Sequence, residues 1–370
     1  MGESTKRVVI LMNTFQTVAR EMVRGIARYA ATYGPWELHP TTNPNTLRGR
    51  DAPDGVIFRP LYDVNARVMR GLRLPAVNIH WDSAGFPRIP RVYWDDRAIG
   101  EMAARYLLDG GFERFAFCAE YRQMGYSLGR EKGFAETVRN AGGAQYDLFD
   151  LHSACKSGVA WPNVQKHLGD WLAKLQPPVG VLTATDLGGV DLLIACRRRG
   201  LRVPEDVCVL SAANDDLMCE VASPPLSAVE IPAFETGYEA AAVLHRMMKG
   251  EPTPKHPHII APKRIVERRS SDMLAIDDAL VVRALRFIRD RAAESVSVAD
   301  VLGHVPLSRR ALELRFKANV GRTIQKEIWR AHIARAKQLL AGTDLPMADI
   351  AEKSGFPNAQ RMTEVFRRET

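Results

Sequence analysis

Hydrophobic residues in the first 270 positions occur in two alternating patterns. Short continuous apolar runs, such as 7–12 and 115–118, are typical of strands buried on both faces of a sheet. Between them, stretches such as 19–33 repeat apolar residues at helical spacing. Further strands are predicted at 56–58, 77–79, 180–184 and 207–210, and further helices at about 64–71, 99–108, 130–140, 163–175 and 186–199. This alternation predicts an α/β fold in which helices cover parallel sheets.

The last 95 residues, 276–370, have a different pattern, and it occurs twice. Residues 298–302 and 307–317 predict a short helix, a turn and a second helix, and residues 347–368 repeat this order. A long helix is expected between the two copies, at 323–340, with Thr323 as its cap. The pattern predicts an all-α tandem helix-turn-helix domain, which suits two adjacent major-groove segments on one face of DNA.

Apolar positions in each copy predict a small core between the two helices. In the first copy the predicted core is Ala299, Val301, Leu302, Leu307, Leu312 and Phe316, and in the second it is Ile350, Ala351, Phe356, Met362, Val365 and Phe366. The polar face of each second helix is then free for double-stranded DNA. Arginine can bond guanine twice, and asparagine or glutamine can pair with adenine. The predicted DNA-binding residues are Ser308, Arg309, Arg310, Glu313, Arg315 and Lys317 in the first copy and Asn358, Gln360, Arg361, Thr363 and Arg367 in the second.

The charge of the chain is concentrated in the same segment. The formal net charge is +8; the last 95 residues contribute +5, from 17 Lys and Arg against 12 Asp and Glu, and the other 275 contribute +3. A single amphipathic helix with a few arginines is usually a solvated helix face. The duplication and the basic excess favour DNA binding over that alternative, because phosphates attract basic surfaces.

Other function classes find little support in the sequence. There is no Gly-x-x-x-x-Gly-Lys phosphate loop, no Gly-x-Gly-x-x-Gly after a strand and no His-Glu-x-x-His, so we expect no enzyme, no cofactor and no metal. Five scattered cysteines without a Cys-x-x-Cys pair indicate a reduced, cytoplasmic protein. No apolar stretch approaches 18 residues, and no signal peptide is recognised at the N-terminus, so neither a membrane protein nor an exported one is expected.

These C-terminal residues resemble the DNA-binding domain of the AraC family of bacterial transcription regulators. The resemblance covers nearly all of that domain and rests on residues 307–313, 315–317, 321–323, 334–340, 350–351 and 354–356. It implies a regulator that binds operator half-sites and works with RNA polymerase. Pro306 stands where the family has a turn glycine, which predicts a different turn because proline fixes φ negative. The Gly-x-Thr-Pro-x-x-Tyr-Arg tail of the family would follow Thr370.

The N-terminal part resembles the effector-binding core of lactose- and galactose-repressor proteins, through the order of elements around Arg130, 185–186 and 204–207. This resemblance implies a two-lobed sensor of the type I periplasmic-binding-protein kind. The implied boundaries are a sensor domain over 1–272, with lobe one at about 6–118 and 228–248 and lobe two at about 119–226, and a DNA-binding domain over 273–370, with helix-turn-helix units at about 297–318 and 346–368. The whole chain then resembles the xylose operon regulators, with 264–272 as the interdomain connector.

The same resemblance implies where an effector binds. Arg130 corresponds to an arginine that bonds sugar hydroxyls, and its alternative role is a salt bridge at a helix start. Thr185 and Asp186 correspond to a polar pair at a strand end, although Asp186 could equally cap the following helix. Sugar sites combine such polar groups with apolar groups on the ring faces.

Other effector contacts are expected from position alone. Asn13, Gln16 and Arg20 follow the first strand and could face the site. Trp81 and Trp94 could pack on a sugar ring, and their alternative role is that of ordinary core or rim aromatics.

One departure concerns the effector. Related sensors carry an aspartate that grips two sugar hydroxyls after the strand predicted at 207–210, and this chain has Ala213 there, followed by Asn214. An unpaired hydroxyl in a closed site costs roughly 1–3 kcal/mol. We therefore expect a sugar other than xylose, or a modified sugar, with Asn214 taking part.

The sequence thus predicts a homodimeric transcription regulator, an activator controlled by a sugar-like effector. An alternative is a DNA-binding regulator whose sensor no longer binds a small molecule and serves in dimerisation or partner docking, which Ala213 keeps open. A sugar-processing enzyme on the two-lobed fold would lack a recognisable pair of catalytic carboxylates.

Overall fold

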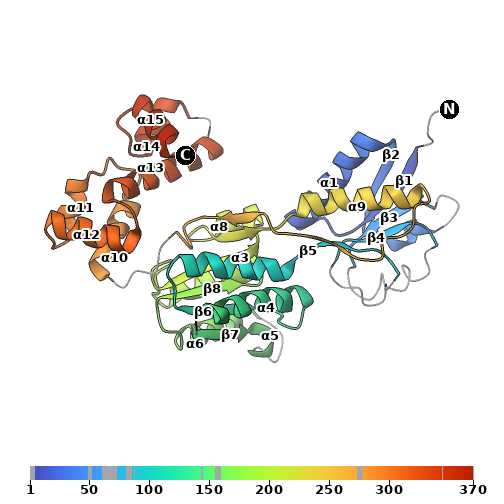
Figure 1. Cartoon of the computed structure of the whole chain (residues 1–370), viewed down its shortest axis with the longest axis horizontal. Helices are drawn as coiled ribbons and strands as arrows, with labels where there is room; N and C mark the ends of the chain where they lie inside the picture. Colours follow the sequence, from blue (N-terminus) through green and yellow to red (C-terminus); the bar gives the residue numbers. More distant parts are fainter. Residues whose placement is uncertain are drawn as a thin grey trace. The chain divides into compact units, whose positions relative to one another are not determined.

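The computed structural model of the chain describes residues 5–48, 52–60, 73–80, 86, 88–142, 145–154, 160–272, 278–343 and 345–369. It contains two compact units, Met1–Met273 and Leu274–Thr370. The first unit is α/β and the second is helical (Figure 1), which confirms the predicted fold class.

The first lobe of the α/β unit is built on a parallel sheet with strand order β2-β1-β3-β4. Its strands are β1 (Lys6–Leu11), β2 (Trp36–Thr41), β3 (Gly55–Phe58) and β4 (Ala76–Asn78), and its helices are α1 (Thr17–Tyr33) and α9 (Ala233–Met248), with a short 3-10 turn, η1 (Pro44–Leu47). α1 and α9 lie side by side (Figure 1). They approach closely at two glycines: a Cβ on Gly25 would lie 2.0 Å from the carbonyl oxygen of Phe234, and one on Gly237 would lie 1.9 Å from that of Met22.

The second lobe is built on a six-stranded sheet with order β12-β10-β9-β8-β6-β7. The strands are β6 (Arg114–Ala119), β7 (Gln145–Asp150), β8 (Val179–Thr183), β9 (Val207–Ala213), β10 (Ser227–Glu230) and β12 (Arg264–Val266), and only β12 runs antiparallel to its neighbour. The helices are α3 (Asp96–Asp109), α4 (Gly125–Asn140), α5 (Leu151–Ala154), α6 (Trp161–Leu172), α7 (Asp186–Arg198) and α8 (Asp216–Val221). A short pair, β5 (Val92–Trp94) with β11 (His258–Ile260), completes the unit.

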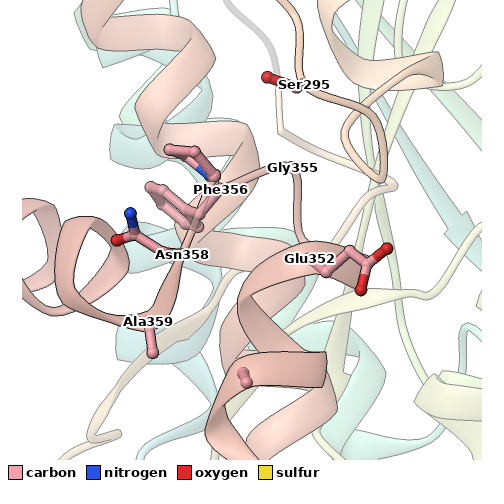
Figure 2. A pocket seen from close by; sticks show the side chains of 8 residues that line it. Ser295, Glu352, Gly355, Phe356, Asn358 and Ala359 are labelled. Carbon is pink, nitrogen blue, oxygen red and sulfur yellow. The ribbon is translucent and has the colours of Figure 1, made fainter.

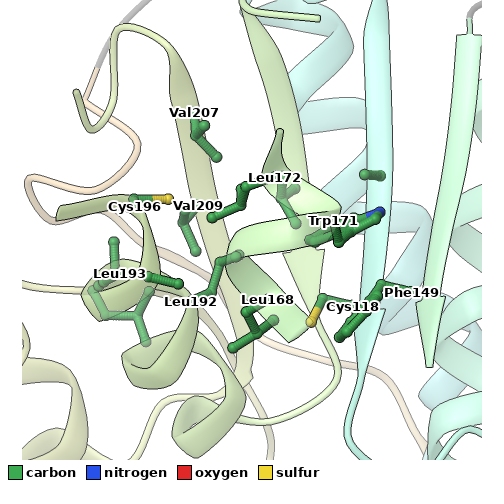
Figure 3. Packing of buried hydrophobic residues seen from close by; sticks show 14 of the residues in the cluster. Cys118, Phe149, Leu168, Trp171, Leu172, Leu192, Leu193, Cys196, Val207 and Val209 are labelled. Carbon is green, nitrogen blue, oxygen red and sulfur yellow. The ribbon is translucent and has the colours of Figure 1, made fainter. Parts of the chain in front are cut away.

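Apolar side chains of α6 and α7 pack on one face of the second sheet (Figure 3). Leu168 and Trp171 of α6, Leu192 of α7 and Val209 of β9 belong to this cluster and are buried. Trp171 also stacks on Phe149, with ring centres 5.0 Å apart. The buried strands read as continuous apolar runs because both faces of this sheet are covered.

The predicted lobe boundary was wrong. β6, predicted in lobe one, lies between β8 and β7 of the second sheet, and α3 packs against α4, so the second lobe begins near residue 96. β10, also predicted in lobe one, pairs with β9 in the second sheet. An apolar run shows that a strand is buried but not which strands it pairs with, so the sequence pattern could not assign β6 to a sheet. The helix predicted at about 64–71 lies outside the described residues.

The second unit consists of α10 (Ala279–Asp290), α11 (Val298–His304), α12 (Arg309–Val320), α13 (Ile324–Gly342), α14 (Met347–Lys353) and α15 (Ala359–Glu369). The side chains of Ser297, Ser308 and Thr323 cap α11, α12 and α13 as N-cap acceptors. Of the predicted first core, Val301, Leu312 and Phe316 are buried, whereas Ala299 is exposed, which corrects that assignment. The second core is confirmed in a cluster that contains Ile350, Ala351, Phe356, Met362 and Val365, with Phe366 partly buried against it.

Candidate effector site and DNA interface

Polar residues follow the carboxyl ends of parallel strands in both lobes. Asn13 follows β1 and Arg59 follows β3, while Glu120, Thr185 and Asn214 follow β6, β8 and β9. Ligands of open α/β sheets bind outside the carboxyl ends of the strands. These strand ends are therefore where a small-molecule site is expected.

Arg130 is a buried hub of the second lobe. It lies on α4, which packs closely on α3 because a Cβ on Gly100 would lie 2.0 Å from the carbonyl oxygen of Arg130. Its Nε donates to Oδ1 of Asp96 over 2.8 Å, and its Nη1 donates to the carbonyl oxygens of Ala184 and, over 3.1 Å, Ala212. The sequence left two roles open for Arg130, a bond to a sugar hydroxyl and a salt bridge. The salt bridge, to Asp96, is present. No bond from Nη2 is found among the residues that the structure describes, so that nitrogen is available to a ligand.

Glu120 shares a hydrogen-bond network with Thr185. The Thr185 hydroxyl donates to Oε1 of Glu120, and the amide of Gly188 donates to the same oxygen over 2.9 Å. The other oxygen, Oε2, is buried and has no hydrogen-bond partner within the described part of the chain. Burial raises the pKa of the Glu120 carboxyl. Because an unpaired buried acceptor is costly, Oε2 suits a donor that a ligand supplies.

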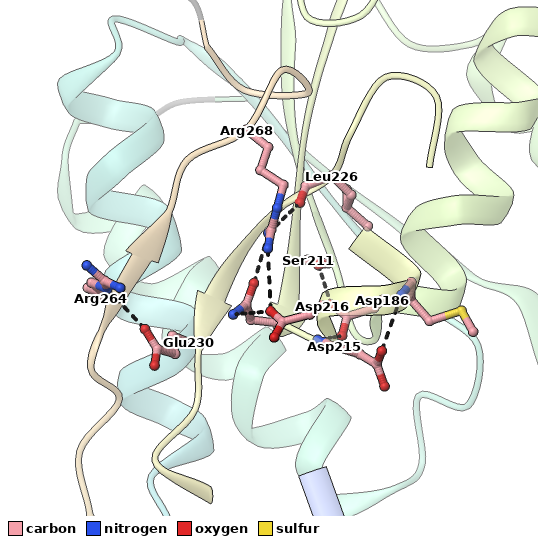
Figure 4. Close-up of polar contacts among 10 residues, drawn as sticks. Asp186, Ser211, Asp215, Asp216, Leu226, Glu230, Arg264 and Arg268 are labelled. Carbon is pink, nitrogen blue, oxygen red and sulfur yellow. Dashed lines mark hydrogen bonds and ion pairs between the residues drawn. The ribbon is translucent and has the colours of Figure 1, made fainter. Parts of the chain in front are cut away.

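Asp186 holds the loop that follows β9 (Figure 4). Its Oδ1 accepts from the hydroxyl of Ser211, and its Oδ2 accepts from the amide of Asp215 over 2.8 Å. Burial raises the pKa of this carboxyl, and these two hydrogen bonds oppose the rise. The N-cap of α7 is Thr185, which accepts from the amide of Gly188 over 3.2 Å. Asp186 therefore fixes a neighbouring loop rather than capping the helix by its side chain.

The residues after β1 form a self-bonded loop. Oδ1 of Asn13 accepts from the amide of Phe15 over 2.9 Å, and Nη1 of Arg20 donates to the carbonyl oxygen of Phe15 over 2.7 Å. Gln16 is the N-cap residue of α1, and its exposed side chain makes no cap bond. Asn13 and Arg20 therefore shape this loop, while the ring of Phe15, 88% exposed, projects from it.

Asn214, a predicted effector contact, is bonded to the segment that follows β12. Its Oδ1 accepts from Nη1 of Arg268 over 2.8 Å (Figure 4). Asn214 has φ 59° and Ala213 has φ 149°, so both depart from the backbone region that L-residues favour. The loop is therefore bonded to the segment that leads out of the first unit.

Several residues of this region were not predicted from the sequence. Asp96 is buried between Arg130 and Trp94, whose indole Nε1 donates to Asp96 Oδ1 over 3.1 Å. The guanidinium carbon of Arg59 lies 6.0 Å from the ring centre of Trp94, which places a residue of the first lobe beside this network. Burial, and then the positive charge of Arg130, lowers the pKa of Arg59. Trp94 is thus buried beside charged groups, and Trp81 lies outside the described residues.

The first reading helix, α12, exposes the predicted residues. Nε of Arg309 is 2.9 Å from Oε1 of Glu313, and Nη1 of Arg315 is 3.5 Å from Oδ2 of Asp278, the N-cap residue of α10. Arg315 therefore leans toward α10, whereas Arg309 lies on the open surface. Leu314 is 63% exposed on the same helix, a contact candidate that the polar pattern did not include. The remaining predicted residues of this helix, Ser308, Arg310 and Lys317, are exposed as well.

The second reading helix, α15, is capped by a residue predicted to bind DNA. Oδ1 of Asn358 accepts from the amide of Arg361 over 2.8 Å, so this side chain is committed to the helix start. Arg361 pairs with Glu364 over 3.0 Å, while Gln360 lies 3.4 Å from the other oxygen of Glu364. The predicted DNA-binding residues Asn358, Gln360, Arg361, Thr363 and Arg367 are all exposed.

The helix α13 joins the two helix-turn-helix units. With 19 residues it is about 28 Å long at 1.5 Å per residue, close to the ~34 Å of one DNA turn. The buried side chain of His332, on α13, lies at the turn between α14 and α15. In this turn Gly355 has φ 77°, and a Cβ on Gly355 would lie 2.4 Å from the carbonyl oxygen of Glu294. Burial lowers the pKa of His332. The turn at Gly355 is therefore packed against both His332 of α13 and the backbone of Glu294.

A hollow of about 550 Å³ lies at this turn (Figure 2). Its lining includes Glu352, Phe356 and Asn358 from α14, the turn and the start of α15. It is part of the DNA-binding unit and contains none of the strand-end residues, so it is not the predicted effector site. In the described ranges, no three His, Cys, Asp or Glu side chains are grouped so that they could hold a metal ion, and none of the helices there is sufficiently long and apolar to span a membrane.

Both units match known families. A periplasmic binding protein-like domain matches residues 104–271, and a helix-turn-helix domain matches residues 302–370. The chain is 30% identical over 382 residues to the xylose operon regulatory protein of Haemophilus influenzae, a match that covers 100% of this chain and 97% of that protein. It is 29% identical to the protein of the same name from Escherichia coli, covering 98% and 94%.

A solved structure extends this similarity to three dimensions. The structure of a xylose-binding transcription activator matches with a TM-score of 0.77 and 28% identity, covering 100% of this chain and 96% of the other. These relatives are transcription regulators, not enzymes. The chain belongs to the family of xylose operon regulatory proteins, which places a helix-turn-helix DNA-binding domain after a sugar-sensing domain.

Proposed function

We propose that this protein is a sequence-specific transcription activator whose DNA binding is controlled by a sugar or sugar-like effector. The observation that carries the proposal is the pair of helices α12 and α15, which expose their polar residues and are joined by the 19-residue helix α13. One unit with two such helices suits two successive major-groove segments of an operator half-site.

The base-reading residues are, in this proposal, exposed residues whose side-chain contacts, within the described part of the chain, stay within their own helix. Arg309 and Arg310 of α12 and Gln360, Arg361 and Thr363 of α15 reach base edges. Ser308, Asn358 and Arg315 shape or brace the reading helices. Glu313 orients Arg309, and Lys317 and Arg367 bind phosphates.

The effector, in this proposal, binds between the strand ends of the two lobes. Nη2 of Arg130 and Oε2 of Glu120 bond its hydroxyls, and the Thr185 hydroxyl keeps Glu120 in place. Phe15 covers a ring face when the lobes close, on a loop that Asn13, Gln16 and Arg20 shape. Asp186 and Asn214 position the loop after β9.

Xylose is named in the relatives, so pentoses are the first effectors to consider. Ala213 offers no carboxylate to a sugar, and leaving a hydroxyl unpaired in a closed site costs roughly 1–3 kcal/mol. We therefore propose a sugar that lacks or replaces the hydroxyl that an aspartate would bind there, such as a deoxy or modified pentose.

The assembly is part of the same proposal. The protein acts in the cytoplasm as a homodimer formed through its sensor lobes, so that two DNA-binding units meet two half-sites, and it recruits RNA polymerase. Closed two-fold dimers are the commonest assemblies of soluble proteins, and operator symmetry mirrors them.

A thermal-shift titration tests the sensor. Because a ligand that binds only the native state raises apparent stability by mass action, the true effector should give a saturable shift in the unfolding of the full chain. The panel contains pentoses, hexoses, deoxy sugars and sugar acids. Ala213 favours one second candidate, a sensor that only dimerises, and the absence of any shift on folded protein would support that candidate and contradict effector control.

A further inference from the structure

Arg268 joins the loop after β9 to the segment that leads toward the DNA-binding unit (Figure 4). Its Nη1 donates to Oδ1 of Asn214 over 2.8 Å and to the carbonyl oxygen of Leu226 over 3.0 Å, and its Nη2 lies 3.6 Å from Oδ1 of Asp216. The Arg268 side chain is only 15% exposed. A single guanidinium thus bridges the 213–216 loop, the strand entering β10 and the connector 264–272.

The connector is bonded along the second sheet from β12 onward. β12 pairs with β10, and beyond it the Ser227 hydroxyl accepts from the amide of Arg268 over 2.7 Å. The Ser270 hydroxyl donates to the carbonyl oxygen of Val209 on β9 over 2.6 Å. This segment therefore follows any displacement of β9 or its loop. It ends at residue 272, and Asp278, the N-cap residue of α10, is bonded to Arg315 of the reading helix α12.

The 213–216 loop is held from two sides. On the side of the proposed effector site, Oδ2 of Asp186 accepts from the amide of Asp215 over 2.8 Å. On the opposite side, Arg268 holds Asn214 and Asp216. Ala213 has φ 149°, a conformation that persists only where surrounding contacts enforce it, whereas Asn214 at φ 59° lies in the left-handed region that asparagine tolerates. The loop is therefore a strained element whose geometry depends on both carboxylate and guanidinium contacts.

We propose that Arg268 is the coupling residue that transmits effector occupancy from the 213–216 loop to the connector and the DNA-binding unit; this rests on the proposed function. Effector binding beside Asp186 changes the loop, and the Arg268 contacts oblige the connector to move with it. A ligand shifts such an equilibrium only through contacts that differ between two states, and the loop supplies those contacts. Arg268 itself does not touch the effector.

The test compares Arg268→Met with Arg264→Met in the full chain. Arg264 is the matched control because it lies on the same connector and its exposed side chain pairs with Glu230 over 3.0 Å (Figure 4). None of the hydrogen bonds found among the described residues joins that side chain to the 213–216 loop. Affinity for a promoter duplex is measured by fluorescence anisotropy with and without saturating sugar, first D-xylose and then the sugar that shifts thermal unfolding most. We expect a change of at least about fivefold in the wild type and in Arg264→Met. In Arg268→Met the ratio should fall to near one while the sugar still binds.

A second variant approaches the contact from the loop. Asn214→Gly introduces a residue that also tolerates φ 59°, and it removes the side-chain oxygen that accepts from Arg268. It should lower the coupling ratio as Arg268→Met does, and the double variant should lower it no further. If both single variants keep the wild-type ratio, the coupling role of Arg268 is wrong.

Hydrogen exchange tests the bridge without any sugar. In the effector-free full chain, Arg268→Met should speed amide exchange in residues 213–221 and in 269–272 together, by at least about tenfold. Arg264→Met should affect only the neighbourhood of β12. Faster exchange at 213–221 alone would show that the loop and connector are not coupled through Arg268. If no sugar binds the wild type, the proposed effector control fails, and this exchange result still decides the bridge.

Discussion

The two functional regions of this protein use arginine in opposite ways. On the reading helices, Arg309 and Arg361 lie on an exposed surface and, among the residues that the structure describes, pair with glutamates of their own helix. At the strand ends, Arg130 is buried and bonded to Asp96 and two carbonyl oxygens. An exposed arginine is free to exchange its weak partner for DNA, whereas a buried one is an integral part of the fold. The difference indicates that DNA recognition uses single exposed side chains, whereas effector sensing depends on a buried hydrogen-bond network.

The strongest test of this contrast removes the buried arginine. Arg130→Met removes the positive partner of the buried Asp96 carboxylate, which keeps only the Trp94 indole as a donor among the described residues, and it removes the donor to two carbonyl oxygens; breaking a buried pair costs about 3–5 kcal/mol. Urea unfolding of the full chain should show this loss in the sensor transition. Arg97→Met is the control, since Arg97 of α3 pairs at the surface with Glu101 of its own helix and with Glu136 of α4, and it should change little. Equal losses in the two variants would contradict the contrast.

On the DNA side, the effect should appear in binding and not in stability. Arg361→Ala should weaken binding to the specific operator by about 1–3 kcal/mol and relax base preference, because a bidentate base contact is lost. Arg291→Ala is a matched control, since Arg291 forms a similar pair with Glu294 outside the reading helices. Titrations on specific and random duplexes distinguish the roles. Equal loss on both duplexes would assign Arg361 to phosphate.

The turn between α14 and α15 sharpens the comparison further, because it is a buried feature within the DNA-binding unit. Gly355→Ala should destabilise this unit by more than about 1 kcal/mol, since φ is 77° and the Cβ would meet the carbonyl oxygen of Glu294. Gly303→Ala, in α11 with no atom near its Cβ, should instead stabilise by about 0.5–1 kcal/mol. Thermal unfolding monitored in this unit compares the variants. A tolerated Gly355→Ala would show that the turn does not require glycine.

The smallest expected effect depends on pH. The pKa of His332 is lowered from 6.5 by burial, so the unfolded chain binds a proton more readily than the folded one. Stability of the second unit should therefore fall as pH drops below about 6.5, down to the folded-state pKa, where the difference is complete. His332→Phe should flatten this dependence, whereas His256→Ala, on the surface, should not. Hydrogen exchange of residues 324–369 across pH 5–8 measures it, and an unchanged slope in His332→Phe would contradict the assignment.

The reading helices could be predicted from the sequence because their signals are local. Helical spacing, caps such as Ser308 and Thr323 and a duplicated pattern are all contained within short windows. Even there, Arg315 and Asp278 are 37 positions apart, so no short window contains their contact, and Asn358 was interpreted as a DNA contact although asparagine directly before a helix is also a local N-cap signal.

The sensor was harder to predict because its contacts join distant segments. The edge strand β2 was missed because its residues are only partly buried and give no apolar run. Asp96 and Arg130 are 34 positions apart, and Arg268 and Asn214 are 54 apart, so no window contains both partners. The family resemblance indicated Arg130 and Asp186, but Glu120 and Arg268 required the strand order and the connector path to be known.

The most direct test of effector control is reciprocal linkage in the wild-type full chain. Effector affinity is measured by calorimetry with and without saturating operator DNA, and operator affinity is measured with and without saturating effector. We expect both affinities to change, and by the same factor, because coupling between two sites is thermodynamically reciprocal. An effector that binds while leaving operator affinity unchanged would contradict the proposal that the sensor controls DNA binding.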